Sequence, residues 1–266
     1  MNKIRLLAID LDGTLLTGQK KILPEVRSAV REAQAADVLV VLASGRIWPS
    51  MARFADQLEL SGPSICGNGT DCRLSPESSF YTVPLPSGVL ENIVEYADEN
   101  GLHLNIYTAD SLYFLRESAW GDLYRSRAET VIPKTLPSDF SKLECLKALI
   151  VDEPGRASEH AITVLGRMPG IAIRATESEP EYIEFMDVNA TKGHALKRLA
   201  AELNVDQAEI AAIGDYLNDH EMLEFARLSG AIGNAHPTIL AMAKVKVSDN
   251  ESGGVAEFIR QFVLQQ

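Results

Sequence analysis

The stretch that decides the fold is residues 4–14, which read IRLLAIDLDGT. Residues 4–9 are mostly apolar and are followed at once by polar residues, which is typical of a buried strand. Side chains two residues apart on a strand point the same way, so Asp10 and Asp12 present two carboxylates at one strand end. Two such carboxylates repel each other unless they share a cation or a proton. This cost favours a divalent-metal catalytic pair, with a plain turn and solvated carboxylates as the alternative.

Two other readings of glycine- and acid-rich loops can be rejected. A calcium-binding loop needs glycine at its sixth position and glutamate at its twelfth. Counted from Asp10, these positions hold Leu15 and Lys21. The G-x-G at residues 67–69 has Cys72 where a dinucleotide loop has its third glycine.

Apolar runs alternate with helical patterns on both sides of the opening stretch. Strands are predicted at residues 38–43, 64–66, 209–213 and 230–232. Helices are predicted from Pro24, around residues 51–58, and after Thr191 as a helix-capping residue. This alternation predicts an α/β fold with a Rossmann-like parallel sheet. Ligands bind at the carboxyl ends of the strands in such sheets, which is where the polar clusters of this sequence fall.

The pattern changes between residues 84 and 187, where helix–strand–strand occurs twice. We therefore predict an α+β cap domain at 84–187, inserted into a catalytic core domain made of 1–83 and 188–266. The cap is expected to close over the cleft and to choose the substrate, with hinges at Pro84, Pro86 and residues 187–190. Four cap side chains could meet a substrate or form an amphipathic face: Arg116, Trp120, Tyr124 and Arg125.

Two further clusters indicate an anion-binding site. Ser44 and Gly45 follow the second strand, and a hydroxyl with a free backbone N–H at a strand end can cradle an anion. Lys192 falls in the first turn of a helix, where a cation opposes the helix dipole unless it faces a carboxylate or a phosphate. A simple Ser-Gly turn and a solvated lysine are the alternatives.

The last cluster is GDYLND at residues 214–219. It gathers Asp215, Asn218 and Asp219 after another predicted strand, which again suggests a metal-binding strand end. An Asx turn that caps the following helix is the alternative, and Asp219 suits both roles.

Composition limits the partners. The net charge of −12 disfavours nucleic acid and anionic lipid as main partners. Three cysteines make a disulfide framework improbable and fit a reducing compartment. The N-terminal apolar run is too short for a signal peptide, and no run of about 18 apolar residues predicts a membrane span. These features predict a cytoplasmic protein, and they do not predict an oligomeric state.

Taken in order, the four clusters resemble the four motifs of the haloacid dehalogenase superfamily. The chain is most similar to the Cof-type phosphatase branch, which has its cap inserted after the third core strand, an Asn-Gly near that strand (Asn68-Gly69) and a later Gly-Asn-Ala (residues 233–235). The resemblance covers essentially the whole chain. Tyr216 and Leu217 depart from the branch, where a small residue is frequent, and Thr70 stands where alanine is common. Neither departure removes a chemical group, so both bear on the substrate more than on the reaction.

The resemblance implies a role for each site residue. Asp10 would be the nucleophile that becomes an aspartyl-phosphate, and Asp12 the general acid/base. Ser44, Gly45 and Lys192 would bind phosphate, and Asn68 and Asn218 the substrate. Asp10, the backbone carbonyl of Asp12, and Asp215 would hold Mg²⁺, with Asp219 in support.

The chemistry makes this set coherent. Phosphoryl transfer needs an in-line nucleophile, neutralised phosphate oxygens and a protonated leaving group. We expect Asp10 to stay ionised on the metal and the pKa of Asp12, near the leaving oxygen, to be raised. The predicted function is magnesium-dependent hydrolysis of small phosphorylated metabolites, such as sugar phosphates. Two alternatives stay open: a sugar phosphomutase or other phosphotransferase, and a non-catalytic sensor of a phosphate ligand.

Overall fold

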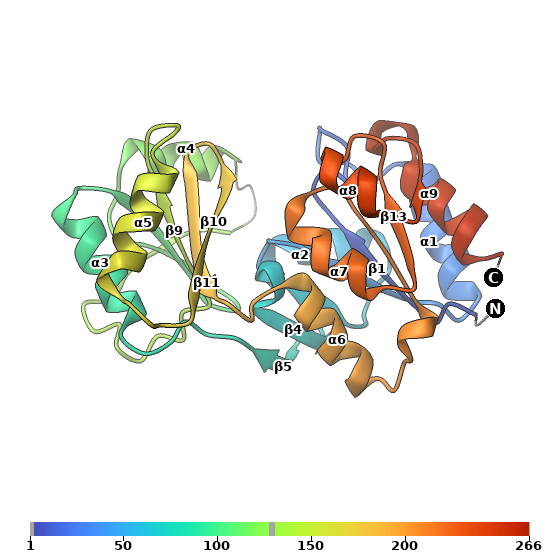
Figure 1. Cartoon of the computed structure of the whole chain (residues 1–266), viewed down its shortest axis with the longest axis horizontal. Helices are drawn as coiled ribbons and strands as arrows, with labels where there is room; N and C mark the ends of the chain where they lie inside the picture. The colour runs from blue at the N-terminus through green and yellow to red at the C-terminus, as the bar shows by residue number, and fades with distance from the viewer. Residues whose placement is uncertain (1–2, 128–130, 266) are drawn as a thin grey trace. The chain divides into compact units, whose positions relative to one another are not determined.

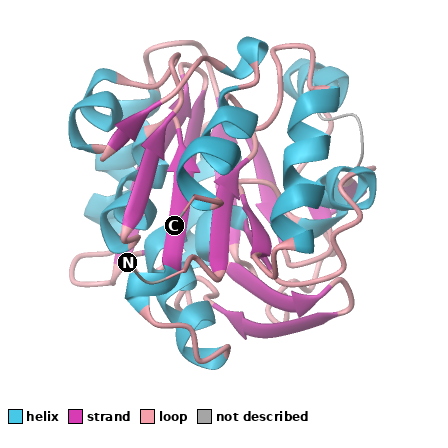
Figure 2. Cartoon of the chain, turned by 90° about the vertical axis from the view of Figure 1, so that its right-hand side faces the viewer, coloured by secondary structure: helices cyan, strands magenta, loops and turns pink. Residues whose placement is uncertain are grey.

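The central strands of the larger sheet are the apolar runs of the sequence. The computed structural model describes residues 3–127 and 131–265. Every residue of β1 (Leu6–Asp10) and β12 (Ile210–Gly214) is buried. Both strands pair in parallel within one eight-stranded sheet, ordered β14-β13-β12-β1-β2-β3-β4-β5. Helices lie on both sides of this sheet (Figure 2), which explains why its inner strands are apolar on both faces.

The chain divides into two units (Figure 1). The core unit contains residues 1–46, 51–81 and 191–266, and the inserted unit contains 47–50 and 82–190. The domain borders expected from the sequence were 83/84 and 187/188. The remaining strands of the core sheet are β2 (Leu39–Ala43), β3 (Ser64–Cys66), β4 (Asp71–Ser75), β5 (Ser78–Thr82), β13 (Leu228–Ala231) and β14 (Val245–Lys246).

Two helices of the core unit begin where the sequence predicts. Pro24 is the first residue of α1 (Pro24–Ala35), which buries Val26, Ala29, Val30 and Ala33 along one face. Thr191 caps α6 (Lys192–Glu202), because its side chain accepts a hydrogen bond from the backbone N–H of His194 at 3.0 Å. The other helices are α2 (Trp48–Gln57), α7 (His220–Phe225), α8 (Pro237–Met242) and α9 (Gly254–Phe258).

The core sheet is not parallel throughout. β4 runs antiparallel to β3, and β5 forms the edge beyond it. A buried ion pair supports β4: Arg73 Nε lies 2.7 Å from Asp71 Oδ2, and Ser79 donates to the other Asp71 oxygen at 2.6 Å. These two strands were not predicted from the sequence.

The inserted unit has a six-stranded sheet of its own, ordered β10-β11-β9-β6-β7-β8. One face, which includes Leu104, Ile150 and Phe185, packs with buried residues of α3 (Val89–Glu99) and α5 (Ala157–Arg167). The two predicted strand pairs are present as β6–β7 and β10–β11. The other elements of this unit are β6 (His103–Tyr107), β7 (Leu112–Phe114), α4 (Ala119–Arg127), β8 (Lys134–Thr135), β9 (Lys147–Val151), β10 (Ile173–Glu179) and β11 (Tyr182–Asp187).

The cap side chains left open by the sequence have partners within this unit. Arg116 pairs with Asp98, and Arg125 pairs with Glu117. Tyr124 accepts a hydrogen bond from the Tyr107 hydroxyl at 2.7 Å, and Trp120 packs beside it on an apolar cluster. These contacts support the amphipathic-face interpretation. Among the described residues, no helix has both the length and the hydropathy needed to cross a membrane.

Candidate active site

The carboxyl ends of three core strands gather the predicted residues. Asp10 is the last residue of β1 and pairs in register with Ala43, the last residue of β2. Ser44 therefore follows beside it. β12, on the other side of β1, ends at Gly214 and delivers Asp215. Parallel strands place their carboxyl ends at one sheet edge, so clusters far apart in sequence become neighbours.

Lys192 joins two carboxylates at this edge. Its Nζ donates to Asp10 Oδ1 and to Asp219 Oδ1, each at 2.6 Å, and the side chain is fully buried. Burial alone would lower the pKa of Lys192, but attraction to Asp10 and Asp219 outweighs it and raises the pKa above its usual value. The solvated-lysine alternative is therefore wrong, and the facing anion is a pair of carboxylates.

Asp219 supports the site and holds the turn that precedes it, whereas its side chain makes no capping hydrogen bond to the following helix, α7. One of its oxygens pairs with Lys192, and Oδ2 accepts hydrogen bonds from the backbone N–H groups of Asp215 and Tyr216 at 3.0 and 3.2 Å. Its side chain is fully buried. Asp219 thus fixes the turn that presents Asp215, and its own oxygens are already engaged.

The remaining carboxylates fit a divalent cation. Asp10, Asp215 and Asp219 can bring one oxygen each within 4.8 Å of one another. Asp10 Oδ2 is buried, and no group among the described residues donates a hydrogen bond to it. Asp215 accepts one hydrogen bond, from Thr14 Oγ1 at 3.0 Å. Because Asp219 is engaged elsewhere, Asp10 and Asp215 are the side chains that would hold the cation.

The pKa values of Asp10 and Asp215 are both raised, which indicates that the site has too little positive charge for its carboxylates. Burial, with repulsion from Asp219, raises the pKa of Asp10 well above its usual value, and Lys192 offsets only part of this. The same two causes raise the pKa of Asp215 to about 6. Gly13 lets Asp215 lie close to the loop after β1, because a Cβ on residue 13 would lie only 2.3 Å from Asp215 Oδ2. The φ angle of Gly13, +84°, also favours glycine.

Asp12 lies in a different electrostatic environment from the one expected. The Arg46 guanidinium donates hydrogen bonds to both Asp12 carboxylate oxygens, at 2.6 and 2.7 Å. Lys20 Nζ donates to Asp12 Oδ1 at 2.7 Å. Burial would raise the pKa of Asp12, but the hydrogen bonds and charges of Arg46 and Lys20 lower it to about 2. The expectation of a raised pKa is therefore wrong for this arrangement. Arg46 was visible in the sequence beside Ser44, but nothing in the sequence linked it to Asp12.

The other predicted residues meet through a loop between β3 and β4. The backbone N–H of Asn68 donates to the Ser44 carbonyl at 2.9 Å, and Asn218 Nδ2 donates to Asn68 Oδ1 at 2.9 Å. A Cβ on Gly45 would approach the Asn68 amide to 3.2 Å. Ser44, Gly45, Asn68 and Asn218 are thus brought together, and their binding roles remain predictions. Asn234, from the later Gly-Asn-Ala, donates to the Gly13 carbonyl at 2.8 Å and ties another loop to the site.

The chain is similar to known proteins along nearly its whole length. Residues 7–259 match the family of haloacid dehalogenase-like hydrolases. The chain is 30% identical to a 5-amino-6-(5-phospho-D-ribitylamino)uracil phosphatase of Bacillus subtilis, covering 98% of this chain and 96% of that protein. It is 26% identical to a pyridoxal phosphate phosphatase of Escherichia coli, covering 96% and 97%. A haloacid dehalogenase-like hydrolase of Bacteroides thetaiotaomicron has a similar structure, with a TM-score of 0.88 at 27% identity over 97% and 99% of the two chains.

The chain belongs to the haloacid dehalogenase-like hydrolase family. Within that family it is an enzyme of the phosphatase class, in agreement with the relatives that it matches along nearly their whole length.

Proposed function

We propose that the chain hydrolyses small phosphomonoesters with Mg²⁺, and that Asp10 attacks phosphorus to form an aspartyl-phosphate. The observation that carries this proposal is the state of Asp10: it is buried, one oxygen is held by Lys192, and no described residue donates to the other. A nucleophile of this kind needs one free oxygen and a fixed direction. Lys192 supplies the direction by holding Oδ1. One Asp10 oxygen would then face Mg²⁺, and the other would attack phosphorus.

The remaining steps are assigned to residues of this chain. Lys192 and Ser44 would attract and orient the oxygens of the phosphoryl group. Mg²⁺ held by Asp10 and Asp215, with the Asp12 carbonyl, would neutralise charge on the phosphate. Asp12 would remove a proton from the water that cleaves the aspartyl-phosphate. Ionised Asp12 suits the role of base in this second step. To donate a proton to the leaving group in the first step, Asp12 must be protonated, which requires its hydrogen bonds to Arg46 and Lys20 to weaken.

The relatives support a substrate class. The two phosphatases compared above act, by their names, on phosphates of a pyrimidine and of a pyridine derivative. We infer that this chain acts on small phosphorylated metabolites of similar size, and that the inserted unit takes part in choosing among them. Cys66, Cys72 and Cys145 are buried and form no disulfide within the described part of the chain, which supports a cytoplasmic setting.

Hydrolysis of 4-nitrophenyl phosphate tests the proposal. We expect turnover with Mg²⁺, no turnover in excess chelator, and a loss of at least about 10³-fold for Asp10→Asn, because a covalent nucleophile has no substitute. Asp56→Asn is the matched control, because Asp56 is exposed on α2. Turnover that survives Asp10→Asn would refute the nucleophile, and turnover that survives the chelator would refute the metal.

A further inference from the structure

Two apolar side chains stand exposed in the turn that carries the site. Tyr216 and Leu217 lie between Asp215 and Asn218, and these residues are 48% and 46% exposed. The other strongly exposed large apolar residues of the described chain all fall at 132–188, within the inserted unit. An adjacent apolar pair in a catalytic turn therefore differs from the scattered exposed residues of an ordinary surface.

The backbone beneath the pair is held in place. Asp219 Oδ2 accepts a hydrogen bond from the backbone N–H of Tyr216, and the Asp219 N–H donates back to the Tyr216 carbonyl at 2.9 Å. Asn218, the next residue, is fixed by its hydrogen bond to Asn68. The pair is thus mounted on the same rigid turn that presents Asp215.

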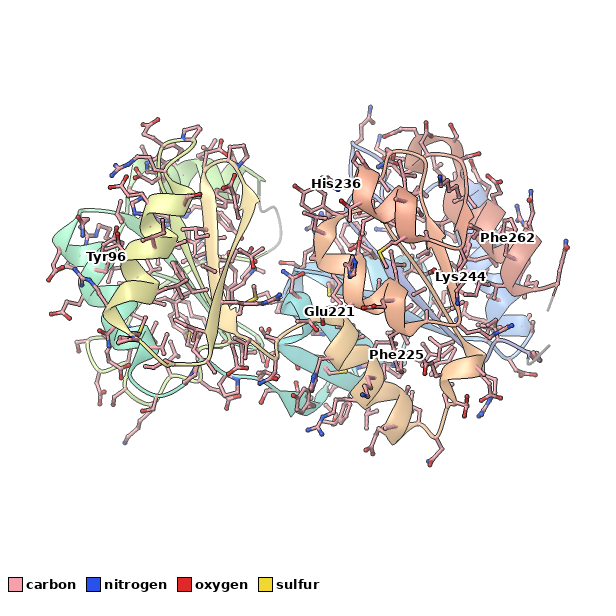
Figure 3. All side chains as sticks on the ribbon, viewed as in Figure 1. Tyr96, Glu221, Phe225, His236, Lys244 and Phe262 are labelled. Carbon is pink, nitrogen blue, oxygen red and sulfur yellow. The ribbon has the colours of Figure 1, made fainter. Side chains whose placement is uncertain are left out.

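The Tyr216 ring is also held by its neighbour. It packs edge-to-face against the imidazole of His236, with 5.6 Å between the ring centroids and an interplanar angle of 83°. His236, labelled on the core unit in Figure 3, donates its backbone N–H to the Asp215 carbonyl at 2.8 Å. An aromatic side chain held in this way has little conformational freedom left to lose when a ligand covers it.

We propose that Tyr216 and Leu217 contact the organic part of the substrate and favour phosphomonoesters that carry a flat aromatic ring over polyol phosphates. The inference rests on the proposed phosphatase function. A flat ring would cover exposed apolar surface and pack on the tyrosine ring. A polyol would gain little there, because its hydroxyl groups need hydrogen-bond partners that an apolar surface does not offer.

Two esters of primary alcohols separate this effect from the chemistry of the leaving group. kcat/KM is measured for benzyl phosphate and for glycerol 1-phosphate, with wild type, Tyr216→Ser, Tyr216→Phe and Leu217→Ser. We expect Tyr216→Ser to lower kcat/KM for benzyl phosphate by roughly 5-fold, mainly through KM, because an aromatic contact is worth about this much. The value for glycerol 1-phosphate should stay within about twofold of wild type by the same reasoning.

Two controls make the result decisive. Tyr216→Phe keeps the ring and should keep the preference, which assigns the effect to the ring. Retained turnover of glycerol 1-phosphate by Tyr216→Ser rules out simple loss of folding. Ile162→Ala removes an exposed apolar side chain from the inserted unit and should change neither ester.

If Tyr216→Ser has the same ratio of kcat/KM for the two esters as wild type, whether or not both values fall, the inference is overturned and the proposed function stays intact. An unchanged ratio with a changed molecular mass in light scattering assigns the pair to an interface and also overturns it. If wild type hydrolyses neither of these esters nor 4-nitrophenyl phosphate, the proposed function fails, and the inference fails with it.

Discussion

Replacing Lys192 by methionine should destabilise the core unit far more than an ordinary lysine substitution. The Lys192 ammonium group is fully buried and makes two hydrogen bonds of 2.6 Å, to Asp10 and to Asp219. Removing one partner of a buried ion pair costs about 3–5 kcal/mol, because the charge left behind is uncompensated. Here two carboxylates are left behind, so we expect about 4 kcal/mol of lost unfolding free energy at pH 8 in a chelator.

The pH dependence of this loss has a definite sign. Lys192 stays charged in the folded and unfolded chain between pH 5 and pH 8, so it adds no pH dependence there. Without it, the pKa of Asp10 rises further above its unfolded value. A carboxyl with a raised folded pKa lowers stability as the pH rises, so the deficit should be larger at pH 8 than at pH 5.

Urea unfolding followed by circular dichroism measures the loss. Lys197→Met is the matched control, because Lys197 is exposed on the same helix, and it should change stability by no more than about 0.5 kcal/mol. Asp219→Asn combined with Lys192→Met should cost less than the sum of the two single changes. If Lys192→Met proves as stable as Lys197→Met, the account of Lys192 as the buried partner of Asp10 and Asp219 is wrong.

Two further predictions concern the metal and the loop at Gly69. The affinity for Mg²⁺, read from the rise in melting temperature on titration, should weaken by at least roughly tenfold from pH 7 to pH 5, because Asp215, with a pKa of about 6, and Asp10, with a raised pKa, must both be ionised to bind. Equal affinities at the two pH values would contradict the assignment of these carboxylates as ligands. Gly69→Ala should destabilise the chain by at least about 2 kcal/mol more than Gly101→Ala in thermal unfolding, although both residues have positive φ. Only a Cβ at Gly69 collides, 2.2 Å from the Thr191 carbonyl, whereas none of the surroundings lies within 4 Å at Gly101; equal losses would show that the clash is relieved.

Much of the core fold could be predicted because its strands obey simple rules. β1, β2 and β12 are short apolar runs, each followed by polar residues, as strands buried on both faces should be. β4 and β5 could not be found in this way. Residues 71–82 mix polar and apolar side chains around Pro76, and the strands depend on a buried ion pair that only the folded chain brings together. Helices such as α8, with six residues, are too short to show a helical period.

The candidate site also contains features that local sequence patterns predict and contacts that only the folded chain forms. The place of Lys192 at a helix start indicated that it could face an anion, but a solvated lysine stayed open, because the helix dipole disfavours a cation there only mildly. The ion pair between Arg46 and Asp12 joins residues 34 apart in sequence and depends on the direction in which each side chain points. No local pattern encodes such a contact, so the direction of the Asp12 pKa shift could not be predicted.

The most direct test of the central claim is to trap the covalent intermediate. The Asp12→Asn variant, which lacks the base for the second step, is mixed with Mg²⁺ and 4-nitrophenyl phosphate, whose leaving group departs without a proton from Asp12. The mixture is quenched in acid, digested and analysed by mass spectrometry. The account predicts one added phosphoryl group on the peptide that contains Asp10, and none when Asp10→Asn is also present. A labelled peptide elsewhere in the chain, or rapid turnover of Asp12→Asn with no labelled peptide at all, would contradict it.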